Sequence, residues 1–323
     1  MNKLNTSAEN TGFAIAIAWP ETYCKQAGNW YDSFLNKIGI ARHHYYKVGH
    51  AALVLVNAAN GECNYFDFGR YHSPWKHGRA RSEKTDPGLK IKTIAQISES
   101  KKEILNFKEI LTELQLNPEC HGEGAIHASY GAINYSKALN KAYWFQDVSP
   151  LPYGPFRYKG SNCSRFVNDS IVAGKPALWS LLKLRLLVPL TPTTLNNVHA
   201  FQHKTIIPKL QNNVPFCPLP LKDKQFLKTT LPQPERVSAI PHDAQWLSGE
   251  GCGSWFHIKT LEMHYQVSRY NTEGEIEFNE KFRLTNENIF DFLQPFRFHY
   301  LSHYKKVRII QNGVIIELTN HSL

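Results

Sequence analysis

The sequence predicts an α+β fold in which an antiparallel sheet packs against helices, followed by a small domain made mainly of strands. Two observations favour this fold class. Over residues 13–172, apolar runs rich in β-branched and aromatic residues alternate with segments of helical periodicity, and from residue 243 onward most patterned segments are typical of strands. The length of 323 residues allows one large domain or two ordinary ones.

The first strand is predicted at residues 13–19, an apolar run that Pro20 ends. This run is too short to span a membrane, and the start of the chain is polar and nearly uncharged. We therefore expect neither a transmembrane segment nor a signal peptide. A helix is expected next, because Trp30, Phe34 and Ile38 recur on one helical face.

A β-hairpin is predicted after this helix. Its strands are residues 48–56 and 63–71, and between them lies Asn60-Gly61, a pair typical of tight hairpin turns. If the turn has two residues, the numbers of paired residues sum to 121. In that register His50 faces Tyr71.

Three helices are expected in the remainder of the first domain. Residues 100–103 have the spacing of a capping box and predict a helix that ends at Pro118, with Leu105 among its buried residues. A second helix is expected at residues 135–146, and a third begins near Cys163.

Residues 178–190 place Lys183 and Arg185 among leucines. We expect a core helix whose two cationic side chains reach the surface. The alternative is an amphipathic helix that lies at a membrane interface.

Prolines mark the boundary between two domains. Seven of them fall within residues 208–242, which predicts a linker or an extended wrapping segment. The chain is therefore divided into a first domain at 1–207, this linker, and a small β-rich domain at 243–323. In the last of these, residues 307–318 predict a hairpin with Asn312-Gly313 at its turn.

The glycine-rich residues 249–255 lack the lysine of a phosphate-binding loop, so we expect a tight turn there and no nucleotide site. No internal repeat is evident in the sequence.

The chain is basic and its cysteines are scattered. A net charge of +10 suits an anionic partner such as a cell-wall polymer or an acidic lipid surface, and no motif for specific nucleic-acid recognition is present. The six cysteines show neither zinc spacing nor a CxxC pair, which predicts free thiols and no metal site. We expect a cytoplasmic protein, and delivery outside the cell by another route stays open.

Cys163 is the first candidate for chemistry. It follows Gly160-Ser161-Asn162 at the predicted start of a helix, where free N–H groups and the helix dipole favour a thiolate. A harmless structural cysteine would also fit this position, so the assignment needs a base nearby. His50 is the candidate base, because it opens a strand that is otherwise apolar and an ionisable group there must be satisfied or functional.

Three segments in this order resemble the circularly permuted NlpC-type papain-like cysteine amidases, the branch that includes the lecithin:retinol acyltransferase-like enzymes. They are the histidine strand at 49–56, the strand at 65–69 and the Asn-Cys-x-x-Phe-Val motif at 162–167. The resemblance covers roughly residues 10–175 and implies a papain-like fold with Cys163 as nucleophile. It also implies that Tyr153 helps to bind the oxyanion. The whole chain also resembles bacterial proteins of uncharacterised activity, which carry no activity over.

The third member of the site is expected on the second hairpin strand, where this family often has a polar residue. Asp67 shares the face of His50 but lies about 13 Å along the strand in the two-residue-turn register, so a wider loop or a bulge is needed. Tyr71 and His72 are the alternatives. We choose Asp67, because a carboxylate between two phenylalanines is costly unless it is paired. The acyltransferase-like enzymes usually have a histidine here, so Asp67 favours the hydrolases.

These residues predict a thiol-dependent hydrolase, a cysteine peptidase or amidase that acts on a peptide or cell-wall fragment. Cys163 attacks a carbonyl carbon, His50 takes the thiol proton and Asp67 orients the imidazole, without a metal or an organic cofactor. Two alternatives stay open. One is a lipid-directed thiol acyltransferase or phospholipase that uses residues 178–190 at a lipid surface. The other is a non-catalytic binding protein, in which Cys163 and His50 lie too far apart to react.

Overall fold

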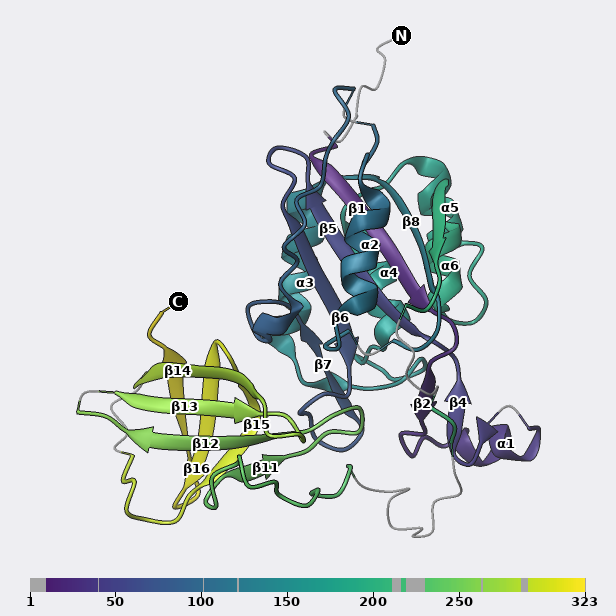
Figure 1. The fold of residues 1–323 in the computed structure, drawn as a ribbon. Coiled ribbons are helices and arrows are strands. Elements are labelled where there is room, and N and C mark those ends of the chain that lie inside the picture. Colours follow the sequence, from purple (N-terminus) through teal and green to yellow (C-terminus); the bar gives the residue numbers. More distant parts are fainter. Residues whose placement is uncertain are drawn as a thin grey trace.

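The computed structural model describes residues 10–39, 41–100, 102–120, 122–210, 216–218, 230–262, 264–285 and 290–322. Its first half is a mixed helix and sheet structure, and its C-terminal part is a β-rich domain beside it (Figure 1). Residues 211–215 and 219–229 of the predicted linker 208–242 lie outside the described residues, and the domain limits drawn from the sequence stay a prediction.

A seven-stranded sheet of antiparallel neighbours forms the centre of the first half. From one edge to the other, its strands are β10 (His203–Ile207), β8 (Ile126–Ile133), β1 (Gly12–Trp19), β5 (His50–Asn57), β6 (Cys63–Gly69), β7 (His77–Arg81) and β9 (Leu151–Pro152). The predicted strand at 13–19 and the predicted hairpin are thereby confirmed. They form the middle of the sheet.

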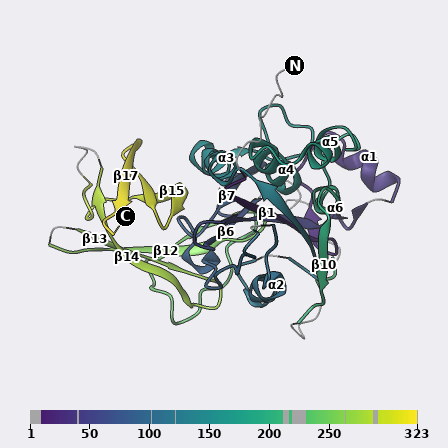
Figure 2. The same cartoon turned by 90° about the horizontal axis from the view of Figure 1, so that it is seen from above.

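Helices cover both faces of this sheet, and alternation along β1 decides which helix fits where. The large side chains Phe13, Ile15 and Ile17 face α2 (Phe107–Leu116) on one side. Ala14, Ala16 and Ala18 face the other side, where their small volume lets helices approach closely. Those helices are α3 (Tyr135–Val148), α4 (Cys163–Ala173), α5 (Leu178–Arg185) and α6 (Thr194–His199), seen opposite α2 in Figure 2.

A small sheet extends from the end of β1 that lies nearest His50. It holds β2 (Tyr23–Lys25), β4 (Tyr45–Lys47) and β3 (Ala41–Arg42), with α1 (Asp32–Lys37) beside it. The predicted helix at 30–38 is thus shorter than expected. Its apolar face is turned to solvent, since the exposed fractions of Trp30 and Phe34 are 85% and 61%.

The C-terminal domain is one antiparallel sheet of seven strands. In spatial order they are β11 (Gln245–Leu247), β12 (Ser254–Thr260), β13 (Tyr265–Tyr270), β14 (Ile276–Leu284), β17 (Val314–Asn320), β16 (Lys306–Gln311) and β15 (Arg297–His303). The predicted turn at Asn312-Gly313 is confirmed, because Gln311 pairs with Val314 and both turn residues have positive φ angles of 50° and 78°.

Two predicted helices differ from the structure. The capping box at residues 100–103 is wrong, because Ser98 accepts the N–H groups of Lys102 and Glu103 and holds this segment in a separate turn. Helix α2 begins only at Phe107, and Leu105 is 63% exposed. The same helix, expected to end at Pro118, ends at Leu116. The second predicted helix, at 135–146, is confirmed as α3.

The core helix expected at 178–190 is also wrong. Helix α5 ends at Arg185, and of its eight residues, all of them described, Leu184 is the one that is buried. Leu181, Leu182 and Val188 are half-buried, and five large apolar side chains of this segment are strongly exposed: Leu178, Trp179, Leu186, Leu187 and Leu190. The helix is too short to bury two faces, so its leucines cover the outside of α4 and α6 only in part.

Candidate active site

The N-terminus of α4 places Cys163 at the middle of the sheet. Asn162 ends the preceding loop in an extended conformation, and its side chain accepts the N–H of Arg165 at 2.8 Å, which caps the helix. The loop before it is fixed by backbone bonds between Gly154 and Ser161 and between Ser161 and Pro152. Cys163 therefore begins the helix as the sequence predicts, and it is 6% exposed.

His50 begins β5, and Gly49 fixes its position. Gly49 has a φ of +76°, and a Cβ there would lie 2.9 Å from the carbonyl oxygen of Trp19. Trp19, the paired residue on β1, stacks on the imidazole with ring centroids 5.8 Å apart. The histidine ring is thus held by a tight turn on one side and an indole on the other.

Cys163 and His50 lie close enough to perturb each other's protonation. Burial raises the pKa of the Cys163 thiol, but the hydrogen bond and charge of His50, with the backbone N–H of Ala51, outweigh it and lower this pKa below its usual value. Burial lowers the pKa of His50, whereas Asp67 and Cys163 raise it further, to about 9. Both directions favour a thiolate–imidazolium pair at neutral pH.

Asp67 reaches His50 because the hairpin loop is wider than the sequence suggests. The pairs Ala52–Asp67 and Val56–Cys63 sum to 119, so the register with a sum of 121 is wrong. Four residues, 58–61, form the loop, closed by the N–H of Asn57 bonding to the carbonyl of Glu62. Asp67 then lies diagonally opposite His50 on the same face, with Oδ2 3.6 Å from His50 Nε2.

Arg81 holds the Asp67 carboxylate from the next strand. The two residues are paired across β6 and β7, and Arg81 Nε and Nη2 donate to Oδ1 and Oδ2 at 3.0 and 2.6 Å. Tyr65 adds its hydroxyl to Oδ2 at 3.2 Å. Burial raises the pKa of Asp67, but Arg81 and His50 lower it well below its usual range, so the carboxylate stays charged.

Of the alternatives to Asp67, Tyr71 packs against His50 and His72 does not. Tyr71 lies edge-on to His50 with ring centroids 6.4 Å apart, and the Arg81 guanidinium lies 3.8 Å from the centre of the Tyr71 ring. His72 turns away from the site, and its Nε2 hydrogen-bonds Ser254 Oγ at 2.7 Å. Tyr153 stacks on Phe68 and lines the same cavity as Cys163. Burial raises the pKa of the Tyr153 phenol well above its usual value, and the charge of Cys163 raises it further.

Two cavities meet at these residues. A cavity of about 250 Å³ opens at Cys163 and is lined mainly by apolar groups, including Val48 and Phe156. A larger one of about 500 Å³ opens at His50 and is more polar. Cys24, Lys25, Arg70 and Tyr153 line both. Together the cavities form a cleft with the reactive pair at its middle.

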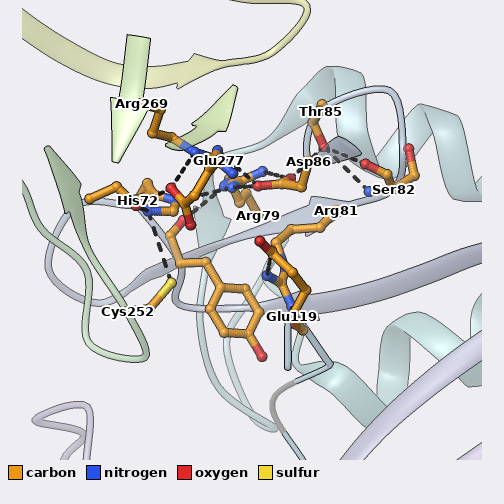
Figure 3. Close-up of polar contacts among 12 residues, drawn as sticks. His72, Arg79, Arg81, Ser82, Thr85, Asp86, Glu119, Cys252, Arg269 and Glu277 are labelled. Atoms are coloured by element: carbon orange, nitrogen blue, oxygen red, sulfur yellow. Dashed lines mark hydrogen bonds and ion pairs between the residues drawn. The ribbon is translucent and has the colours of Figure 1, made fainter. Parts of the chain in front are cut away.

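A buried ionic network joins the two halves of the chain next to this cleft (Figure 3). Asp86 accepts two hydrogen bonds from Arg79 at 2.8 Å and one from Arg269 of the C-terminal domain at 3.0 Å. Arg269 also bonds Glu277 at 2.7 Å. In the same network, Ser254 joins His72 to Glu277. Several charges shared in this way between two domains fix their relative position.

Sequence reasoning did not identify Arg70, Arg81 or Glu250. A signal for Arg81 exists, since His77–Arg81 alternates basic residues within an apolar context, but the register of β7 on β6 was needed to pair it with Asp67. Glu250 lies 180 positions from its partner Arg70, and nothing local indicates that contact.

Among the residues that the structure describes, His, Cys, Asp and Glu side chains form no group of three that could hold a metal ion. No helix in the described part of the chain is long and apolar enough to cross a membrane.

The fold and the site define a protein with mixed helices and sheets, in which a buried cysteine at a helix start lies near a histidine, and a carboxylate approaches that histidine from the next strand. The chain belongs to the type VI secretion system effector TseH-like family, whose model matches residues 14–178, more than half of the chain. A second family model, the DUF6695 C-terminal domain, matches residues 244–321.

Among solved structures, the chain is similar to the crystal structure of the type VI secretion system effector TseH. The identity is 18% and the TM-score 0.41, over 62% of this chain and 95% of that one. The comparison with curated proteins gives no match.

Proposed function

We propose that this protein is a cysteine peptidase or amidase with a permuted papain-like first domain and Cys163 as its nucleophile. The observation that carries the proposal is the buried group Cys163, His50 and Asp67, in which Cys163 and His50 perturb each other's pKa, Asp67 lies 3.6 Å from His50 and Arg81 fixes Asp67. Such a group provides a nucleophile, a base and an orienting carboxylate. A non-catalytic role is disfavoured, because the pKa of the thiol is lowered and that of the imidazole is raised, as a reactive pair requires.

In the proposed reaction the Cys163 thiolate attacks the carbonyl carbon of an amide, and the new oxyanion lies near the free N–H at the start of α4. Tyr153 is the proposed second donor. The imidazolium of His50 gives its proton to the leaving amine as the C–N bond breaks, which leaves a thioester. His50 then takes a proton from water, which attacks the thioester, and the C–S bond breaks to release the acid and restore the Cys163 thiolate beside the His50 imidazolium.

A cell-wall peptide is the proposed substrate, and the type VI effector family to which the chain belongs supports delivery outside the producing cell. The charge of +10 fits an anionic wall polymer.

The test is the rate of iodoacetamide alkylation of Cys163 from pH 5 to 10, followed by mass spectrometry in the wild type and in His50→Ala. We expect an inflection below the ordinary thiol value of about 8.5 that disappears in the variant. An ordinary inflection in both proteins would refute the proposal. With reactivity established, release of new amino groups from wall peptides then tests the substrate, with Cys163→Ala as the blank.

A second candidate is a lipid-directed thiol acyltransferase or phospholipase. It is favoured by the apolar cavity at Cys163 and by the exposed leucines of residues 178–190, which lead into the cavity wall at Thr191–Thr193. Fatty-acid release from anionic vesicles, lost in Cys163→Ala and reduced by Leu187→Glu, would favour this candidate. Release of amino groups from wall peptides in the absence of vesicles would exclude the lipid-directed candidate.

A further inference from the structure

A loop of the C-terminal domain forms one wall of the candidate cleft. The N–H groups of Glu250 and Gly251 donate to the carbonyl oxygen of Arg70 at 3.0 and 2.9 Å, and Cys252 forms a β-bridge with Tyr71. Glu250 and Gly251 therefore line the cavity of about 500 Å³ into which His50 faces. The loop lies in the active-site half of the molecule, although it belongs to the other domain.

Glu250 also reaches the site through Arg70. Its carboxylate accepts a hydrogen bond from the Arg70 guanidinium, and its second oxygen accepts the N–H of Lys76 at 3.0 Å. Arg70 is fixed further by the carbonyl of Lys25. Its guanidinium lies 4.8 Å from the centre of the Tyr153 ring, which lines both cavities.

This pair is buried, and that makes its geometry rigid. The side chains of Arg70 and Glu250 are 6% and 0% exposed. Without Glu250, Arg70 would be a buried cation without its carboxylate, and it would be free to leave the face of Tyr153. The position of Tyr153 at the cleft therefore depends on a residue of the C-terminal domain.

We propose that the C-terminal domain is a working part of the active site, in which Glu250 positions Arg70 against Tyr153 and Glu250 and Gly251 form a substrate-facing wall in the cavity at His50. The proposal rests on the proposed function, because it takes Cys163 and His50 as the reactive pair. Glu250 is a positioning residue in this scheme. The wall that it belongs to contacts the part of a substrate that extends beyond His50.

The charged side chains that line this cavity should affect how fast a charged reagent reacts with Cys163. Lys25, Arg70, Glu123 and Glu250 line it, and Glu250 is the carboxylate that pairs with Arg70. Glu250→Gln keeps the shape of the side chain and its acceptor oxygen but removes the negative charge. The cleft then becomes more positive, which favours an anionic reagent over a neutral one of similar size.

The experiment compares the alkylation of Cys163 by iodoacetate, which is anionic, and iodoacetamide, which is neutral, in the full chain. Mass spectrometry gives the two rate constants at Cys163, and thermal unfolding verifies that each variant is folded. We expect the iodoacetate-to-iodoacetamide ratio to rise several-fold in Glu250→Gln, because the cavity loses one negative charge. Glu250→Asp, which keeps the charge, should return the ratio toward the wild-type value.

Glu277→Gln is the matched control. Glu277 is an acidic residue of the same domain in an ion pair with Arg269, and it does not line the cavity. Its ratio should equal that of the wild type. A ratio that is unchanged in Glu250→Gln, or raised equally in both variants, would overturn the proposal.

A second variant keeps the test decisive if Glu250→Gln does not fold. Leu231 lines the same cavity at the rim, next to the loop, since its N–H bonds to the carbonyl of Gly249. Leu231→Ala should speed modification of Cys163 by the bulky N-cyclohexylmaleimide several-fold relative to iodoacetamide. An unchanged relative rate would show that the wall does not border the path to Cys163. Failure of the proposed function looks different, because Cys163 would then react slowly with every reagent at neutral pH.

Discussion

Replacing Asp67 by Asn tests the electrostatic chain from Arg81 to Cys163. Asp67 Oδ2 lies 3.6 Å from His50 Nε2. At an effective dielectric constant of about 20, two unit charges at this distance attract each other by about 5 kcal/mol, or roughly three pKa units. The pKa of His50 is about 9 with Asp67 present and should fall to about 6 in Asp67→Asn.

The sign of the effect on Cys163 follows from His50. In the wild type the imidazole is protonated below about pH 9, so its positive charge favours the thiolate at neutral pH. In Asp67→Asn the imidazole is neutral at pH 7 and the pKa of Cys163 should rise toward the ordinary thiol value. Alkylation of Cys163 by iodoacetamide at pH 6.5 should therefore slow by about tenfold or more. A pH profile identical to that of the wild type would refute the reasoning.

The control separates electrostatics from stability. Asp67→Asn leaves Arg81 buried without its carboxylate, which should lower the free energy of unfolding by about 3 to 5 kcal/mol. Asp67→Asn/Arg81→Met also removes that cation and should recover most of the stability in urea unfolding. In the double variant the alkylation rate of Cys163 should still have its inflection at a higher pH than in the wild type. An inflection restored to the wild-type value would mean that the unpaired Arg81, and not the loss of Asp67, caused the change.

Three further predictions concern the rest of the chain. Peptide mass spectrometry should show that Cys163 is alkylated at pH 7 well before the four cysteines whose pKa burial raises to about 12, which are Cys24, Cys63, Cys120 and Cys252. Equal alkylation rates would contradict the lowered pKa of Cys163. Asp86→Asn removes the carboxylate that two buried arginines pair with, and it should lower the free energy of unfolding, measured in urea, by about 3 to 5 kcal/mol. Asp243→Asn, at a half-exposed ion pair, should lower it by less than about 1 kcal/mol. Similar losses in the two variants would argue against the network. Gly313→Ala should cost about 1 to 2 kcal/mol through backbone strain alone, because φ is +78° and a Cβ there would contact nothing within 4 Å; a neutral result in urea unfolding would contradict the positive-φ turn.

The strands and the helix at Cys163 were predictable because their signals are local. An apolar run ended by Pro20, a turn pair at Asn312-Gly313 and a capping Asn162 each act within a few residues. Their structures follow from short-range sterics and hydrogen bonds, which one sequence contains in full.

The arrangement around Asp67 could not be predicted in the same way. The hairpin register depends on whether residues 58–61 form a four-residue loop or Asn60-Gly61 forms a two-residue turn, and the side chains alone allow both. The exposure of Leu187 was missed for a related reason. An apolar segment predicts burial only when the fold supplies a surface to cover it, and α4 and α6 already cover the sheet on that side.

The network at Asp86 limits how this chain can exchange parts with its relatives. Asp86 and Arg79 belong to the first half of the chain. Arg269, which pairs with the same carboxylate of Asp86, belongs to the C-terminal domain. A chimera that kept Asp86 but lost Arg269 would remove one of the two arginines that this buried carboxylate pairs with, so the two halves are best recombined as a matched set.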